Sequence, residues 1–166
     1  IPVAYRVARA EKISPLLLVS AAMLHDIGWA FVPKRHVRSY HSRHARLLHM
    51  RRGAVAAGSI LRELGYPAVL RERIVHLVAV HDLPSAGVGR PLKGRYESLL
   101  RDIDFSWRFM RGGFRKDMTE YGSPDPIAFL NSLIEKAHSE GRFRSRSTSR
   151  IVTALIRERQ REVERK

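Results

Sequence analysis

The chain has 166 residues, no cysteine, a hydrophobic content of 44% and a formal net charge of +15 at pH 7. This length favours one domain with a proper core, and the lack of cysteine excludes disulfides and thiolate metal sites, so any metal must be held by His, Asp or Glu. No apolar run is long enough to cross a bilayer and the N-terminus lacks a signal-peptide layout, so we expect a cytoplasmic protein that does not bind membranes.

The first half of the chain predicts four helices separated by proline and glycine. Ser14 is typical of an N-cap, Pro15 suits the first helical position, and Gly28 stops the apolar segment that follows. Gly65 is placed as a left-handed C-cap. We expect the first helix to end near residue 12 and the other three to span 15–24, 45–64 and 67–81.

The second half begins with a long Gly/Pro-rich loop at 82–94, of the kind that is usually functional or mobile. Helices are predicted from Arg95 to Met110 with Gly112-Gly113 as the stop, from Pro126 to Gly141, and from a cap at Thr148 or Ser149 onward. Strand-like alternation is almost absent, so the prediction is an all-α domain of six or seven helices. The last helix has an apolar stripe that must be buried, which argues against a separate domain after Gly141.

The dipeptide His25-Asp26 closes the apolar helix 15–24. A helix that is apolar nearly all round is buried, and an imidazole and a carboxylate at its end are costly unless something binds them. A divalent metal suits both ligands. The alternative is that both side chains only cap the helix and face solvent.

The spacing of the remaining histidines separates candidate metal ligands from histidines that have no expected role at the site. His49 lies four residues before Gly53 on a helix with an alanine-rich face, and His81 is the last residue of an apolar-faced helix. His76 is about 140° round that helix from His81, so the two cannot face one metal. The histidines that we expect to be at the surface or satisfied by partners are 36, 41, 44, 76 and 138.

Two aspartates in a later helix, Asp102 and Asp104, point about 200° apart, so only one can enter the core. Asp104 shares its face with Leu100 and Trp107 and is therefore predicted to be the more buried of the two.

This ordered set resembles the HD superfamily of metal-dependent phosphohydrolases, whose pattern is His…His-Asp…His…His…Asp on an all-α scaffold. By this resemblance His25 and Asp26 match the signature pair, His49 and His81 the two middle histidines, and Asp104 the final aspartate. The similarity spans roughly 3–110. It implies a single HD-type domain over 1–166, with 1–110 as the metal-site core and 111–166 as additional C-terminal helices.

The chain departs from the family pattern at two places. The family's first histidine lies one helix earlier, where this chain has Val3, so that ligand lies upstream of residue 1 or is absent. Trp29 stands where the family often has a lysine that helps to hold phosphate. Lys34 or Arg35 would have to take its place.

The resemblance implies a phosphohydrolase acting on a nucleotide or similar phosphorylated anion, with a divalent cofactor (Mn, Mg, Fe, Co, Ni or Zn). Such an ion lowers the pKa of its water and acts as a Lewis acid. His25, Asp26 and Asp104 would form one site, and Asp26, His49 and His81 a second, with Asp26 as the bridge. His25 and Asp26 are the expected catalytic residues.

Two stretches concentrate the positive charge. Residues 34–52 hold seven Lys/Arg and no acid, and Lys34, Arg35 and Arg38 are the predicted substrate-binding residues. Residues 142–166 hold nine basic residues against three Glu. This stretch is either a solvent-exposed helix with no binding role or an anion-binding surface. The alternative function is a catalytically impaired scaffold that binds nucleic acid. Such a module would bind with strong salt dependence and be indifferent to a chelator.

Overall fold

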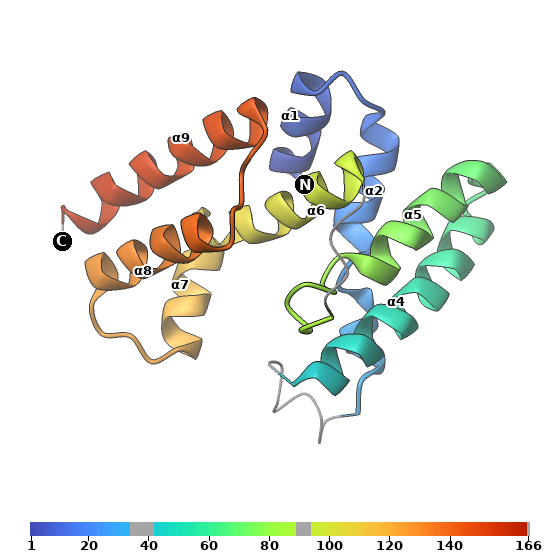
Figure 1. The fold of residues 1–166 in the computed structure, drawn as a ribbon, viewed down its shortest axis with the longest axis horizontal. Helices are drawn as coiled ribbons and strands as arrows, with labels where there is room; N and C mark the ends of the chain where they lie inside the picture. Colours follow the sequence, from blue (N-terminus) through green and yellow to red (C-terminus); the bar gives the residue numbers. More distant parts are fainter. Residues whose placement is uncertain (34–41, 89–93, 166) are drawn as a thin grey trace. The chain divides into compact units, whose positions relative to one another are not determined.

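The computed structural model of the chain describes residues 1–33, 42–88 and 94–165, and in this part of the chain it is all-α. The described residues contain eight α-helices, one or two more than the sequence predicts, together with two short 3₁₀ helices (Figure 1). In chain order they are α1 (Pro2–Ala10), α2 (Pro15–Leu24), η1 (Ile27–Phe31), α4 (Arg43–Glu63), α5 (Ala68–Val80), α6 (Arg95–Ser106), η2 (Trp107–Phe109), α7 (Arg111–Glu120), α8 (Pro126–Ser139) and α9 (Arg146–Val163).

The chain forms two compact units, Ile1–Arg101 and Asp102–Lys166, and each is described by itself. The division falls within α6. The single domain expected from chain length stays a prediction.

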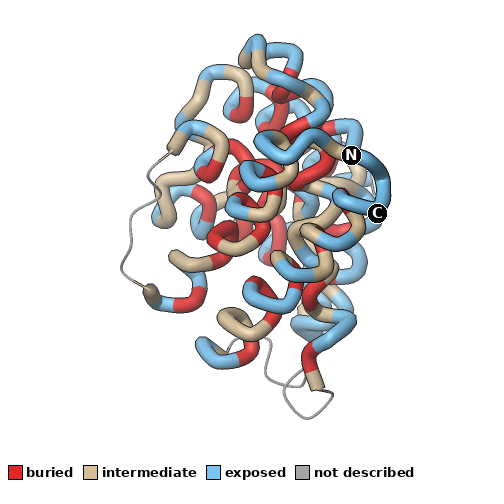
Figure 2. The backbone as a smooth tube through the Cα atoms, turned by 90° about the vertical axis from the view of Figure 1, so that its right-hand side faces the viewer, coloured by how far each residue is buried: buried red, intermediate tan, exposed pale blue. Residues whose placement is uncertain are grey.

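In the first unit, α2 packs against α1 and α5, while α4 packs against α5 and η1. Figure 1 shows α4 and α5 running side by side, and Figure 2 shows that buried residues recur along the helices on their inner faces. The large apolar side chains of this unit that are almost fully buried are Val7, Leu17, Leu18, Met50, Leu61, Ile74, Val78 and Leu100.

Local signals in the sequence place these helices well. The predicted helix 15–24 coincides with α2, which begins with Pro15 after the N-cap Ser14. Gly65 follows α4 with a φ of +71°, and the Tyr66 N–H donates to the Leu61 carbonyl, so the predicted left-handed C-cap is confirmed. Ser42 caps the other end of α4 by accepting from the Ala45 N–H.

The second unit has a core built from aromatic and aliphatic side chains of α6, η2, α7, α8 and α9. The buried members are Phe105, Phe109, Phe114, Phe129, Leu130, Leu133, Ala137 and Val152. Asp125 caps α8 through hydrogen bonds from the Ile127 and Ala128 N–H groups, and Gly141 follows this helix with a φ of +59°. The start and end predicted for this helix are therefore confirmed.

Two predicted boundaries in the second unit are wrong. Gly112-Gly113 does not stop a helix but lies in the first turn of α7. A Cβ on Gly113 would lie 2.1 Å from the Trp107 carbonyl oxygen, so glycine is required there for close approach of two backbone segments. The cap of α9 is Ser145 rather than Thr148 or Ser149, because the Ser145 side chain accepts from the Thr148 N–H.

Across the described ranges, no helix combines the length and the apolar character that a membrane crossing requires.

Candidate metal centre

Glycine brings the His25-Asp26 segment against α4. A Cβ on Gly28 would lie 1.9 Å from the His49 carbonyl oxygen and 2.6 Å from the Gly53 nitrogen, so η1 and α4 meet backbone to backbone. Gly53 is the matching small residue on α4, where a Cβ would lie 3.2 Å from the Gly28 nitrogen. Because His49 lies four residues before Gly53 on α4, this close contact between η1 and α4 places Asp26 beside His49.

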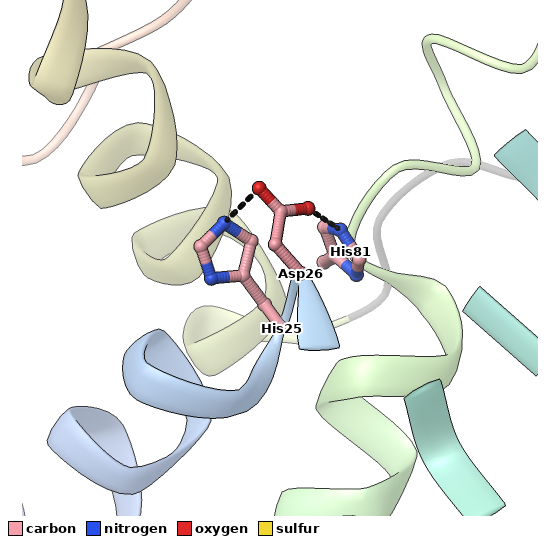
Figure 3. Close-up of side chains that lie close together, drawn as sticks. All are labelled: His25, Asp26 and His81. Carbon is pink, nitrogen blue, oxygen red and sulfur yellow. Dashed lines mark ion pairs between the residues drawn. The ribbon is translucent and has the colours of Figure 1, made fainter. Parts of the chain in front are cut away.

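Three histidines face the Asp26 carboxylate. His25 Nε2 lies 3.4 Å from one carboxylate oxygen, Oδ2. His81 Nε2 lies 3.7 Å and His49 Nε2 3.8 Å from the other, Oδ1. Figure 3 shows His25 and His81 on opposite sides of the carboxylate, each toward a different oxygen. Ligand atoms of His25, Asp26 and His81 all lie within 4.8 Å of one another.

The hydrogen bonds of His25 and His81 define their tautomers. His25 Nδ1 lies 2.9 Å from the Ala22 carbonyl oxygen, and His81 Nδ1 lies 2.8 Å from that of Val78. A carbonyl only accepts, so in each ring the proton is assigned to Nδ1 and the lone pair of the neutral ring is on Nε2. Both lone pairs therefore face the carboxylate oxygens, an arrangement that a cation would stabilise.

His49 is buried, with a side-chain exposure of 1%. Neither of its ring nitrogens has a hydrogen-bond partner among the described residues. Burial and, after it, the charge of His81 lower the pKa of His49 to about 4. His49 is therefore neutral at pH 7, which is the form that binds a metal.

The Asp26 side chain is 56% exposed, so the centre is open to solvent at this carboxylate. Partial burial acts to raise the pKa of Asp26, but the contact with His81 and the charges of His25, His81 and His49 outweigh it and hold that pKa well below its ordinary value. The carboxylate is ionised at neutral pH. The three imidazoles and this carboxylate fit a divalent cation by donor chemistry and by the unsatisfied His49 nitrogens.

Trp29 contacts two members of the cluster. Its indole Nε1–H donates to Asp26 Oδ1 at 3.1 Å, and its ring centroid lies 4.1 Å from that of His49. The sequence marks Trp29 only as a departure from a family lysine. In the structure it orients the carboxylate, a role that its position three residues after Asp26 in a 3₁₀ helix makes possible.

Sequence reasoning also missed an ion pair beside the cluster. Asp82 is buried directly after His81, and its carboxylate pairs with Arg46, one helical turn before His49. The pair links α4 to the residue that follows His81, the C-cap of α5. A signal was present, because His81-Asp82 repeats the His-Asp dipeptide of residues 25–26.

The prediction that Asp104 is more buried than Asp102 is wrong. Asp102 is buried and accepts from the Phe143 N–H at 3.0 Å and from the Thr148 hydroxyl at 3.0 Å, whereas Asp104 is half-buried. These donors precede and begin α9, so the face of α6 that carries Asp102 is the covered one. Asp104 belongs to the second unit, and its participation in the metal centre stays a prediction.

The other predicted residues divide between described and undescribed parts of the chain. Lys34, Arg35 and Arg38 lie outside the described residues. His76 Nε2 lies 2.9 Å from Glu97 Oε1, which confirms that His76 is satisfied by a partner and not by the centre. His138 is exposed on α8, in agreement with its predicted surface position.

Comparisons of the chain with protein-family models, with curated proteins and with solved structures found no match.

Proposed function

We propose that the chain is a metal-dependent phosphohydrolase that acts on a nucleotide or similar phosphorylated anion in the cytoplasm. The observation that supports this proposal is the convergence of three imidazole Nε2 atoms on one carboxylate, within 3.4–3.8 Å. The ordered resemblance to the HD superfamily adds to this observation. The resemblance indicates which reaction is catalysed, whereas the geometry supports only the binding of a metal ion.

The residues divide the work of such a centre. His25 and His81 would bind a divalent ion through Nε2, each held by its Nδ1–H bond to a carbonyl one turn earlier. Asp26 offers separate oxygens to His25 and to His81, as a bridging ligand would. When bound, the ion would lower the pKa of a water molecule and neutralise charge on the phosphoryl oxygens.

Substrate capture is assigned to basic side chains. We propose that Lys34, Arg35 and Arg38 bind the phosphate, because they follow the His-Asp segment directly and no acid lies between 34 and 52. Asp104 is kept as a further proposed ligand.

Removal of the Asp26 carboxylate tests the proposal. Asp26→Ala and Asp26→Asn should lose bound metal and lower phosphoester turnover by about 10³-fold or more, because a Lewis-acid ion supplies several kcal/mol of transition-state stabilisation. The measurement is metal content by mass spectrometry and hydrolysis of p-nitrophenyl phosphate after chelator stripping and reloading with Mn²⁺. Glu135→Gln, at an exposed position of α8, is the control for loss of one carboxylate.

Turnover by the stripped and reloaded Asp26→Asn variant at the wild-type rate would reject the enzyme proposal. A wild-type chain that binds no metal, hydrolyses no phosphoester and retains nucleic acid in the presence of chelator would favour the binding-module alternative.

A further inference from the structure

Four arginines of α9 form a row along one face of the helix, and we call them the Arg stripe: Arg146, Arg150, Arg157 and Arg161. At 100° per residue the four positions fall within an arc of about 60°, and they span about 22 Å along the axis. All four residues are exposed. The stripe therefore presents a straight row of guanidinium groups to solvent.

Among the described residues, no acidic side chain pairs with the arginines of the stripe. In the part of the chain that the structure describes, none of the four forms an ion pair, and their one side-chain hydrogen bond runs from Arg161 Nε to the Arg157 carbonyl at 3.3 Å. Both glutamates within α9, Glu158 and Glu162, contact Arg159 instead. Glu164, beyond the end of the helix, is the single acid in line with the stripe.

Other arginines of the same unit show the contrast. Arg108 pairs with Asp117 at 2.6 Å, and Arg111 and Arg115 pair with Glu162 at 3.3 and 3.0 Å. Within the stripe, Arg146 and Arg150 are four residues apart, as are Arg157 and Arg161, and like charges at this spacing destabilise a helix by about 0.2–0.5 kcal/mol per pair. A helix destabilised by like charges that form no ion pair within the described residues is typical of a functional surface.

The residues around the Arg stripe argue against a lipid surface and against single-stranded nucleic acid as its partner. The opposite face of α9 is buried through Ile151, Val152 and Arg159, so this helix has no apolar face free to enter a lipid surface. The α9 sequence contains no aromatic residue, so the stripe lacks the base-stacking platform of single-strand binders. What remains is a rigid row of phosphate-binding groups.

We propose that the Arg stripe binds the sugar–phosphate backbone of double-stranded nucleic acid without reading its sequence. Arginine binds phosphate bidentately, and contacts to phosphate fix position without carrying sequence information. The metal centre lies in the other unit, and the proposal does not depend on its activity.

The test compares two full-length variants that each lose four positive charges. One replaces the stripe (Arg146→Gln, Arg150→Gln, Arg157→Gln, Arg161→Gln), and the matched control replaces exposed basic residues of the first unit (Arg6→Gln, Arg9→Gln, Lys12→Gln, Arg62→Gln). Glutamine keeps good helix propensity. Circular dichroism and the thermal midpoint establish that both variants fold.

Binding to a labelled duplex of about 20 base pairs is measured by fluorescence anisotropy between about 50 and 200 mM salt, with chelator present throughout. Each lost phosphate contact reduces the magnitude of the slope of log affinity against log salt concentration by about 0.9. The slope of the stripe variant should therefore be smaller in magnitude by up to about 3.6 than that of the wild type. Its affinity at low salt should be lower by a factor on the order of 100. The control should lose less than about 1 of slope.

Equal losses in the two variants would overturn the proposal, because they would reflect net charge alone. Tighter wild-type binding to a single strand than to the duplex would overturn it as well. So would a stripe variant that loses affinity for vesicles of anionic lipid while keeping its affinity for the duplex. Failure of phosphoester hydrolysis bears only on the metal centre, so the two proposals fail separately.

Discussion

The lone pairs at the centre are directed by two helix ends with the same local geometry. His25 is the C-cap of α2 and His81 the C-cap of α5, and each ring donates to the carbonyl three residues earlier. The last carbonyls of a helix lack intrahelical partners, so a histidine at this position satisfies one of them and leaves Nε2 for a ligand. The sequence places both histidines at helix ends, but their tautomers follow only from the structure.

Trp29 is predicted to act on the metal through Asp26. Trp29→Phe removes the indole N–H that Asp26 Oδ1 accepts at 3.1 Å while keeping an aromatic ring near His49. Outer hydrogen bonds of this kind typically contribute 10–100-fold to metal affinity, so we expect Mn²⁺ affinity to fall by about 10-fold. Competition with a chelating indicator measures the change.

The second tryptophan gives the matched control for this substitution. Trp107 lies in the second unit and is 41% exposed, so Trp107→Phe should leave Mn²⁺ affinity unchanged. Moreover, a Trp107→Phe protein reports only on Trp29, whose fluorescence should be quenched by Co²⁺. Unchanged affinity in Trp29→Phe would show that this hydrogen bond does not orient the carboxylate.

The resemblance to the HD superfamily, carried by the order and spacing of His25, Asp26, His49 and His81, predicts that these residues converge, and the structure brings the four together. The Arg46–Asp82 pair is not predictable in this way, since the resemblance assigns no role to either residue. The error on Asp102 has a different origin. Its donors, the Phe143 N–H and the Thr148 hydroxyl, come from a distant segment that no local periodicity reveals.

At the scale of elements, glycine decides how close η1 comes to α4. We predict that Gly28→Ala destabilises the protein by about 3 kcal/mol, because the added methyl would overlap the His49 carbonyl and force two backbones apart. The same displacement moves His49 away from Asp26, so Mn²⁺ affinity should fall too. Urea denaturation and metal titration measure the two effects.

Gly58→Ala, on α4, is the control for Gly28→Ala. A Cβ at Gly58 would meet only a methyl of Val75 at 3.5 Å, and alanine in a helix interior is favoured over glycine by about 0.5–1 kcal/mol. This variant should therefore be slightly more stable than the wild type. If Gly28→Ala behaved likewise, the backbone contact would not constrain the centre.

The helices were predicted best where capping residues are unambiguous. Pro15 at the first position of α2, the positive φ of Gly65 and the capping side chain of Asp125 mark true boundaries, since each acts within a single turn. The missed helix α7 begins before Gly112-Gly113, a pair that locally indicates a stop. Tertiary contact of Gly113 with Trp107 overrides that signal, and such contacts are not encoded in local propensity.

At the scale of the whole molecule, the near absence of strand-like alternation predicts the all-α class but not the division into two compact units. Of the net charge of +15, the segment 1–101 carries 17 basic residues against 6 acids and 102–166 carries 14 against 10. The histidines of the candidate metal centre thus lie in the more basic unit, which agrees with the proposed phosphorylated substrate because positive charge attracts anions. The Arg stripe lies in the other unit, where most remaining arginines are paired.

The acid stability of the metal-free protein should depend on His49. Its pKa falls from 6.5 to about 4 on folding, so the unfolded chain binds a proton between these pH values that the folded chain does not. Stability is therefore greatest above pH 6.5 and declines as the pH falls toward 4, by up to about 3 kcal/mol. Asp26, whose pKa is also lowered, adds to the decline only below its ordinary value of 3.8.

Urea denaturation with chelator present, followed through Trp29 fluorescence in a Trp107→Phe protein, measures this decline in the unit that holds His49. His49→Gln removes the titrating imidazole, so its stability should vary much less between pH 6.5 and 4 even if its absolute stability is lower. His138→Gln, at an exposed position, should keep the full decline. If His49→Gln and His138→Gln declined equally, another group would be the origin of the acid sensitivity, and a neutral, buried His49 would no longer explain it.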